Sequence, residues 1–246
     1  MAKKILIALL KGILAGLSIG LGGFLFILMR YLIPGEGGIA LGSFLFSVGL
    51  FLVCTFQFFL YTGKIGNLFE KKQDKEYYIS LPIMLIGNAI GAFGLGYIFY
   101  FIFRNDSSMM ETVYNVCVSR TILFDFDDYL SLMLKSFLCG TCVYLAVKAF
   151  SLNRLKLKGI FLLVFFVFVF VYAGFQHCIA NMFYFGFGNH IYGETFINLG
   201  LCILFNSLGT IPGILLYRVF SKKSNYKFNN YLFEVVNKLS IIKKQQ

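Results

Sequence analysis

Charged residues are scarce in this sequence of 246 residues: they make up 13% of it, whereas hydrophobic residues make up 59%. Soluble domains carry about a quarter charged residues, so this chain has too few to cover a water-exposed globule of its size. The scarcity excludes an ordinary soluble protein and predicts that most of the surface faces lipid. Tryptophan is absent as well, so tyrosine must supply any aromatic belt at the membrane interface.

Acidic residues are especially few, with 11 Asp and Glu against 22 Lys and Arg, and the net charge is +11. In a soluble protein such an excess would indicate nucleic-acid binding. Here the basic residues lie between apolar runs, which is typical of anchoring against the anionic cytoplasmic leaflet. The predicted partner is therefore the lipid bilayer, and no nucleic acid is expected.

Motifs for metals, cofactors and catalysis are missing too. The six cysteines form no CxxC pair and have no metal-type spacing with histidine, so they are interpreted as small buried hydrophobes. The sequence contains no P-loop, no GxSxG and no HExxH. We therefore expect no metal, no cofactor and no enzymatic activity.

What the sequence has in abundance is long apolar runs. Each is near or above the ~20 residues that a helix needs to cross a bilayer. The first begins close to the N-terminus, is too long for a signal-peptide core and is interpreted as a transmembrane helix. The prediction is one membrane domain over residues 1–246 with six transmembrane helices. The six predicted spans are 5–30, 40–60, 78–103, 129–151, 157–185 and 196–220.

The distribution of basic residues predicts the orientation of these spans. Lysine and arginine concentrate in "EKKQDKEYY", in "SLNRLKLKG" and beyond the sixth span, all on one side of a six-span model, together with Lys3 and Lys4. The positive-inside rule then places both termini in the cytoplasm of a cell (inner or plasma) membrane. Residues 221–246 are predicted to be a basic cytoplasmic tail.

The two halves of the chain resemble each other. Three crossings reverse the chain direction, so two three-span halves, about 5–103 and 129–220, would form an inverted repeat, whose binding site typically lies at the membrane midplane. The matching blocks are "KGILAG" with "KSFLCG" and Phe46 with Phe170, both at an offset of 124, and "GNAIGAFGLGY" with "GTIPGILLY" at an offset of 122.

The middle span of each half ends in a similar way. The second span ends in "FLYTGKIGN" and the fifth in "GFQHCIANMFYFGFGN", so glycine and asparagine cluster where a continuous helix is expected. Irregular backbone at membrane depth is tolerated only where it lines a cavity or is buried in protein. The pattern predicts interrupted second and fifth helices that face each other across a pathway.

Histidine is nearly absent, with only two in the chain, and His177 directly follows the apolar run of the fifth span. A single histidine in a soluble core is usually structural, but ionisable groups inside membranes are costly and usually functional. Burial favours the neutral imidazole, which can share a proton with an anion. Of the other charges, Lys64 could attract anions, Lys148 is expected to snorkel, and Asp127 or Asp128 is expected to cap the fourth span.

The segment "GFQHCIANM" resembles the fifth-helix signature of the formate/nitrite transporter family, G-F-E-H-S-x-A-N-M. "GSFLFSVGL", "LYTG", "LIGNAIGA" and "FLCGTCVYLAV" are similar to the second to fourth helices of that family. The resemblance implies a homopentamer of six-helix protomers with an aquaporin-like helix arrangement. Each protomer would conduct small monovalent anions such as formate, nitrite, hydrosulfide or lactate through its own pore.

The resemblance also implies roles for individual residues. His177 matches the central pore histidine, Thr62 the threonine of the interrupted second helix, and Asn181 the asparagine one turn beyond the histidine. Gln176 stands where the family usually has glutamate. The positions that match the two apolar constrictions are Phe46, Leu50, Leu60, Tyr61 and Phe170.

Three further positions depart from the family pattern. Gly140 and Thr210 stand where the fourth and sixth helices of the family often have asparagine. A lysine expected at the outer mouth has no clear match, and Arg120 is the nearest cation. These departures concern the substrate and the coupling to protons more than the fold.

The sequence thus predicts a channel or a proton-coupled transporter for small monovalent anions, with protons as co-substrates. The alternative is an aquaporin-like pore for neutral solutes. Against this alternative, neither half contains an NPA motif, and a pore for neutral solutes has no use for His177.

Overall fold

The computed structural model describes residues 2–122, 124–153 and 155–220, and every regular element in this part of the chain is a helix. Five segments are long and apolar enough to cross a membrane, judged by length and composition. The predicted all-α fold with membrane-length helices is therefore confirmed, and the predicted tail 221–246 lies outside the described residues. The five segments are α1 (Ala2–Leu32), α2 (Glu36–Thr55), α5 (Lys75–Phe103), α7 (Phe126–Leu152), and α10 (Gly193–Leu208) continued by α11 (Thr210–Phe220).

The predicted spans 40–60 and 157–185 are both divided. In the first, α2 ends at Thr55 and five non-helical residues complete the span; the short helices α3 (Tyr61–Lys64) and α4 (Asn67–Glu70) follow beyond residue 60. The second consists of α8 (Leu157–Tyr172), five non-helical residues and α9 (Cys178–Phe187). Neither α8 nor α9 reaches the ~20 residues of a full crossing. The interruption of these two predicted spans is thus present in the structure.

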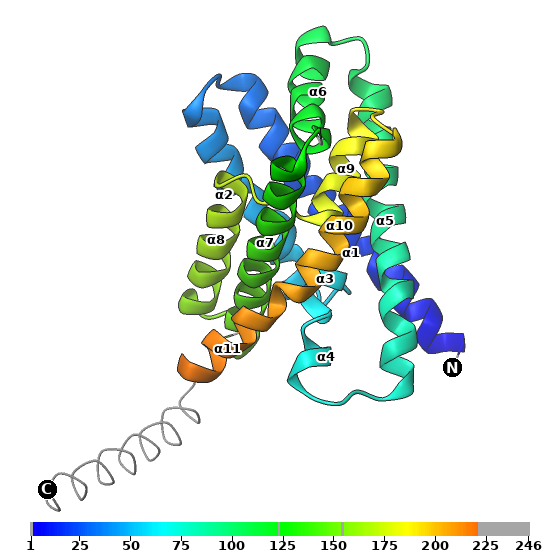
Figure 1. Cartoon of the computed structure of the whole chain (residues 1–246), viewed down its shortest axis with the longest axis vertical. Helices are drawn as coiled ribbons and strands as arrows, with labels where there is room; N and C mark the ends of the chain where they lie inside the picture. The colour runs from blue at the N-terminus through cyan, green and yellow to red at the C-terminus, as the bar shows by residue number, and fades with distance from the viewer. Residues whose placement is uncertain (1, 123, 154, 221–246) are drawn as a thin grey trace, which may run out of the picture.

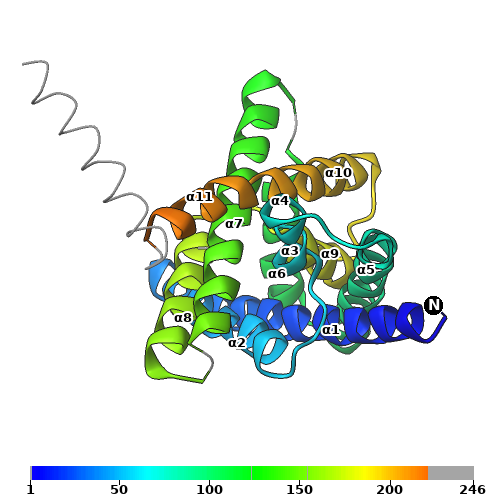
Figure 2. The same cartoon turned by 90° about the horizontal axis from the view of Figure 1, so that it is seen from below.

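The described chain begins and ends at the same end of the bundle. Figure 1 shows the start of α1, the end of α11 and α4 at the lower end, which we call the α4 end. The opposite end, called the α6 end, carries α6 (Ser107–Thr121) and the connection from α9 to α10. Seen from below, α3 and α4 lie near the centre of the bundle among the long helices (Figure 2).

The α1 glycines pack inside the protomer. A Cβ on Gly12 would lie 2.9 Å from the carbonyl oxygen of Met84, and one on Gly16 would lie 2.2 Å from that of Asn88, both on α5. Such contacts let two helix backbones approach closely. The face of α1 that carries Gly12 and Gly16 is therefore internal.

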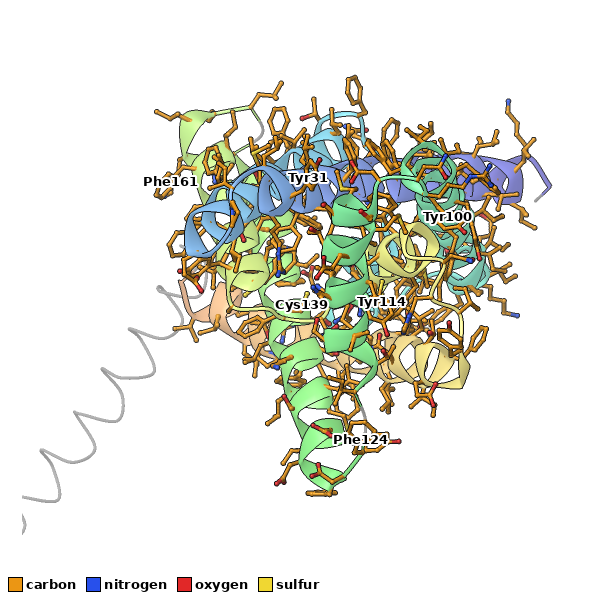
Figure 3. The ribbon with its side chains drawn as sticks, turned by 90° about the horizontal axis from the view of Figure 1, so that it is seen from above. Tyr31, Tyr100, Tyr114, Phe124, Cys139 and Phe161 are labelled. Atoms are coloured by element: carbon orange, nitrogen blue, oxygen red, sulfur yellow. The ribbon has the colours of Figure 1, made fainter. Side chains whose placement is uncertain are left out.

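The N-terminus of α7 differs from the prediction. Asp125 is the N-cap, and its side chain accepts the backbone N–H of Asp128 at 3.0 Å. The expectation that Asp127 or Asp128 is the cap is wrong, because the helix begins at Phe126, before both of them. The exposed Phe124 marks this projecting tip of the molecule in Figure 3.

Lys148 does not snorkel into water as expected. Its Nζ donates to both carboxylate oxygens of Glu70, at 2.7 and 2.9 Å, and lies 4.6 Å from the centre of the Tyr217 ring. The Tyr144 hydroxyl also donates to Glu70. Both side chains of the ion pair are largely buried, so Glu70 fastens α4 to α7.

Candidate functional site

The first interruption follows α2. The helix ends at Thr55, and Gln57 adopts a left-handed conformation with φ of 56°. The N–H of Phe58 then donates to the carbonyl of Val53 at 2.9 Å, which closes the helix end. The chain continues extended through Leu60 before α3 begins.

The second interruption, after α8, repeats this geometry 117 residues later. Gly174 has φ of 69°, in the position that Gln57 occupies in the first. The N–H of Phe175 donates to the carbonyl of Phe170 at 2.9 Å, as Phe58 does to Val53. The chain runs extended through His177, and α9 follows.

Asn88 of α5 holds the first interruption. Its amide nitrogen donates to the carbonyls of Phe59 and Gly12, both at 2.8 Å, and its oxygen accepts the N–H of Tyr61 at 2.8 Å. Asn88 is fully buried, so its side chain satisfies backbone groups that the broken helix leaves unpaired.

Asn206 of α10 does the same for the second interruption. Its amide nitrogen donates to the carbonyls of Gln176 and Ser136, both at 2.8 Å, and its oxygen accepts the N–H of Cys178 at 3.0 Å. Gln176 and Cys178 lie 117 residues after Phe59 and Tyr61, the partners of Asn88. The two interruptions are therefore held by equivalent sets of bonds.

These two asparagines correct the alignment of the halves. The sequence suggested an offset of 122 for this block, which places Thr210 opposite Asn88; the bonding pattern instead pairs Asn88 with Asn206, at an offset of 118. A matching glycine supports the correction, because a Cβ on Gly16 or Gly140 would lie 2.2 Å from the carbonyl oxygen of Asn88 or Asn206, respectively. The shared pattern N-x-x-G, in "NAIG" and "NSLG", is the signal that sequence reasoning missed.

The two interruptions meet at Thr62 and His177. Thr62 Oγ1 lies 2.8 Å from His177 Nε2, and both side chains are almost completely buried. Thr62 is in α3, just beyond the first interruption, and His177 is the N-cap of α9, at the end of the second. The structure thus brings together two predicted site residues that are 115 positions apart.

The backbone fixes the tautomer of His177. The N–H of Ala180 donates to Nδ1 at 3.2 Å, so a neutral imidazole carries its hydrogen on Nε2. That N–H then donates to Thr62 Oγ1, which leaves the hydroxyl hydrogen of Thr62 for another acceptor. A second proton on His177 is opposed by the occupied Nδ1 and by the positive end of the α9 dipole.

Apolar side chains flank this pair. The rings of Phe46 and Phe170 meet edge-on with centroids 5.9 Å apart, and the Phe170 ring lies 5.9 Å from that of His177. Leu50 and Leu60 are also buried. Because the bonds at the two helix ends make Val53 the counterpart of Phe170, the predicted equivalence of Phe46 and Phe170 at an offset of 124 is wrong.

Tyr61 takes a different position from the other predicted constriction residues. It is only partly buried, and its hydroxyl lies 3.0 Å from Ser207 Oγ of α10. Its backbone N–H, rather than its ring, makes the bond to Asn88.

A cavity of about 270 Å³ lies on the α4-end side of Leu60. We call it the inner cavity; its lining includes Cys54, Lys64 and Phe150. The Lys64 ammonium lies 5.7 Å from the centre of the Phe59 ring. Lys64 is thus a cation on the wall of the inner cavity and has no ion-pair partner among the residues that the structure describes.

A much smaller hollow of about 10 Å³ lies on the other side of His177. We call it the outer chamber; Phe46, Phe170, His177, Asn181 and Arg120 are among the residues that line it.

Asn181 organises the wall of the outer chamber. Its amide nitrogen donates to Gln176 Oε1 at 2.8 Å and to Asn198 Oδ1 at 2.9 Å, and its oxygen accepts from Arg120 Nε at 3.0 Å. The amide is therefore engaged by three side chains, and its bonds hold Gln176 and Arg120 rather than the imidazole.

Arg120 is the residue of this site to which sequence reasoning assigned no role. It lies at the end of α6, its guanidinium carbon is 4.6 Å from the centre of the Tyr184 ring, and its carbonyl accepts from Asn198 at 2.8 Å. Its place was missed because α6 lies between two predicted spans, and the predicted spans do not show where this helix packs against the bundle.

Comparison with known proteins identifies a matching family and two similar structures. The family model described as Formate/nitrite transporter matches residues 1–216. A search of curated proteins found no match. Two solved structures are similar in fold: "Pentameric formate channel with formate bound" (TM-score 0.69, 21% identity, covering 94% of this chain and 98% of that one) and "FNT family ion channel" (TM-score 0.73, 20% identity, covering 89% and 96%).

Proposed function

The chain belongs to the formate/nitrite transporter family, and from this premise we propose that it is a channel or proton-coupled transporter for small monovalent anions such as formate, nitrite or hydrosulfide. The observation that carries the proposal is the buried bond between Thr62 and His177, at the meeting point of two interrupted helices. One of the two similar structures is a formate channel with formate bound, which makes formate the first anion to test.

In this proposal α8 and α9 together make the fifth of six crossings, and the halves 5–103 and 129–220 form the inverted repeat. The matched bonds of Asn88 and Asn206 support it, because a repeat predicts the same backbone geometry at both interruptions. The excess of lysine and arginine on the α4 end would place that end, and both termini, in the cytoplasm of the cell membrane.

The pathway runs between the inner cavity and the outer chamber. Leu50 and Leu60 form the apolar barrier on one side of His177, and Phe46 and Phe170 form it on the other. A bare anion would lose its hydration there at a large cost in free energy. Lys64 and Arg120 raise the local concentration of anions at the two approaches to the barrier.

The central pair meets the anion with a hydrogen bond. His177 donates its Nε2 hydrogen to Thr62, and the Thr62 hydroxyl then donates to the anion, so the imidazole strengthens the hydroxyl as a donor while remaining neutral. The proton that neutralises a weak-acid anion in the dry zone comes from the water phase, because His177 is held in a form with only one proton to share.

The assembly proposed is a homopentamer with one pore in each subunit, in a lipid bilayer. The support is the pentameric state of the similar formate channel, together with apolar side chains exposed on the surface of this chain. Mass measurement in lipid or mild detergent tests this independently of transport.

The function is tested by flux into liposomes that contain the purified protein. We expect formate, nitrite or hydrosulfide to enter faster than into protein-free liposomes, and glycerol to enter at the protein-free rate. Glycerol entry without anion entry would replace the proposal with a pore for neutral solutes.

A further inference from the structure

The inner cavity and the outer chamber are built from equivalent positions but differ greatly in volume, about 270 Å³ against about 10 Å³. Six residues of the inner cavity each have a counterpart 117 positions later on the lining of the chamber. The residues without such a counterpart, among them Arg120 and Tyr184 on the chamber side, therefore distinguish the two hollows. The six are Val53, Cys54, Phe58, Leu60, Gly63 and Lys64.

The side chain of Arg120 forms part of the wall of the outer chamber. It enters from α6, outside the two interruptions, with its guanidinium over the Tyr184 ring and its Nε bonded to Asn181. Asn181, which is neutral, is the counterpart of Lys64. The cation of the outer chamber is therefore supplied by Arg120 of α6 and not by the position equivalent to Lys64. Lys64 lines the larger inner cavity, whereas Arg120 lines the much smaller outer chamber.

The bonds of Arg120 leave its charge uncompensated. Its Nη1 donates to the carbonyl of Val116 at 2.7 Å and to Ser119 Oγ at 3.3 Å, and its Nε donates to an amide oxygen. In residues 2–122, 124–153 and 155–220 no carboxylate forms an ion pair with it. A partly buried cation that bonds only to neutral groups gains stability when an anion arrives.

Arg120 also separates two hollows. Besides the outer chamber it borders a cavity of about 280 Å³ between the end of α6 and the start of α7, which we call the side cavity. Lys135, Ser131 and Asp128 line the side cavity, together with Gln176, which bonds to Asn181. Seen from above, α6 stands beside the start of α7, with Tyr114 on α6 and Phe124 at the projecting tip (Figure 3). A movement of the Arg120 side chain would connect the chamber with the side cavity.

We propose that Arg120 is the gate and the selectivity residue of the outer chamber: its guanidinium leaves Asn181 to bind an incoming anion, and this movement opens the chamber. The inference rests on the proposed function, because it assigns a regulation to the same pathway. One hydrogen bond to a charged donor is exchanged for another, so the movement is close to balanced in free energy.

The chemistry of the gate defines the preferred substrate class. A guanidinium presents parallel N–H donors that match two oxygens of a planar anion, which an ammonium does not. Formate and nitrite each offer such a pair of oxygens, whereas hydrosulfide has one acceptor atom. Arg120 therefore favours planar two-oxygen anions.

A cysteine introduced into the outer chamber gives a direct test of the gate. Cys54 lines the inner cavity, and its counterpart Val171 lines the outer chamber. We would introduce Val171→Cys in a Cys54→Ser background and add a small neutral, membrane-impermeant thiol reagent to the membrane face on which α6 lies. Parallel samples would carry Arg120, Arg120→Ala or Arg120→Met.

We expect Arg120→Ala to accelerate labelling at residue 171 at least tenfold, because it removes a long side chain from the chamber wall. Arg120→Met leaves an unbranched chain of similar length, so labelling should stay within about twofold of the Arg120 background while formate flux falls. Equal labelling rates in all three proteins would overturn the gate.

Selectivity is the second readout, and Arg120→Lys is its control because it keeps the charge. The ratio of formate flux to hydrosulfide flux should fall at least fivefold in Arg120→Lys, since the ammonium lacks the fork. An unchanged ratio would overturn the selectivity role.

The outcomes separate this inference from the proposed function. If the unmodified protein carries formate but the labelling rate at residue 171 does not change with the side chain at residue 120, the gating role is wrong and the transport function is retained. If no anion crosses the unmodified protein but labelling responds to Arg120→Ala, the transport function is wrong and the gating geometry stands.

Discussion

The two interrupted segments of this protein have the same backbone and different chemistry. Each has a left-handed residue at its second position, continues through an extended stretch and is bonded to an asparagine from another helix. Where the first places Leu60, the second places His177. The first continues into a helix of four residues, and the second into a helix of ten that are all buried.

This difference shows which parts of the site are scaffold and which are chemistry. Asn88 and Asn206 solve the same problem, the unpaired backbone groups of a broken helix in an apolar setting. Only the second interruption puts a titratable ring at the centre, and only the first supplies the hydroxyl of Thr62 that bonds to it. The pathway therefore needs both interruptions, in unequal roles.

The largest effect is expected from removing one of the two asparagine side chains that bond to the interruptions. Asn206→Leu would leave the N–H of Cys178 unpaired, at about 1–3 kcal/mol, and would leave the carbonyl of Gln176 with only the weak Cys202 thiol donor, so Asn206→Leu and Asn88→Leu should both be harmful. The yield of folded oligomer by size-exclusion chromatography measures this, with Asn→Asp at each position as an intermediate control. If one leucine variant assembles normally and the other yields no folded oligomer, the two asparagines are not equivalent.

The next effect separates the two central side chains. His177→Ala removes the donor behind Thr62 and should lower formate flux about tenfold, the equivalent of losing one hydrogen bond to an anion. Leu60→Ala removes apolar bulk and should raise flux or leak instead. Flux into liposomes decides this, and a decrease of similar size in both variants would mean that the two positions act alike.

A smaller effect tests the left-handed residue. Gly174 has φ of 69° with no atom within 4 Å of a Cβ built there, so Gly174→Ala adds backbone strain without a clash, about 1 kcal/mol. Gly94→Ala is the matched control, because its Cβ also meets open space but its φ is not left-handed. Thermal unfolding in detergent should show a lower midpoint for Gly174→Ala only; equal midpoints would remove the strain argument.

The smallest effect is expected at the α4 end of the molecule, where Glu70 joins α4 to α7 through its bonds to Lys148 and Tyr144. Burial raises the pKa of Glu70, but its bonds to Lys148 and Tyr144 outweigh this and hold the pKa below its usual 4.5. A lowered pKa means that the stabilisation is present at neutral pH and is lost as the pH falls through the folded-state value. Glu70→Gln should lower stability at pH 7 by about 1 kcal/mol or less, and the difference between the two proteins should shrink only as the pH falls below 4.5. A constant difference across that range would contradict the assignment.

Several features of the site could be predicted from the sequence. The apolar runs define the helices, and clusters of glycine and asparagine in "FLYTGKIGN" and "GFQHCIANM" mark both interruptions. Thr62 and His177 were selected by resemblance to the family, and they lie within hydrogen-bond distance. These signals are local in the chain, which is why a single sequence carries them.

The rest depends on contacts that are distant in the chain. The N-x-x-G pattern marks Asn206 in the sequence, but its bonds to the carbonyls of Ser136 and Gln176 appear only in the folded chain. Arg120 reaches Asn181 from 61 residues away, through a connection whose path no periodicity describes. Lys148 looked like a snorkelling residue because Glu70 is 78 positions distant.

The central claim is that Thr62 and His177 act as one donor to a passing anion, and formate flux against pH tests it most directly. Wild type, Thr62→Ser, Thr62→Val and His177→Ala would be compared in liposomes at equal protein content. Thr62→Ser keeps the hydroxyl and should retain most of the flux. Thr62→Val keeps the shape without the hydroxyl and should lose about as much flux as His177→Ala, about tenfold, at every pH. If the Thr62→Val and His177→Ala curves both coincide with wild type in magnitude and shape, the pair is only packed structure and the account is contradicted.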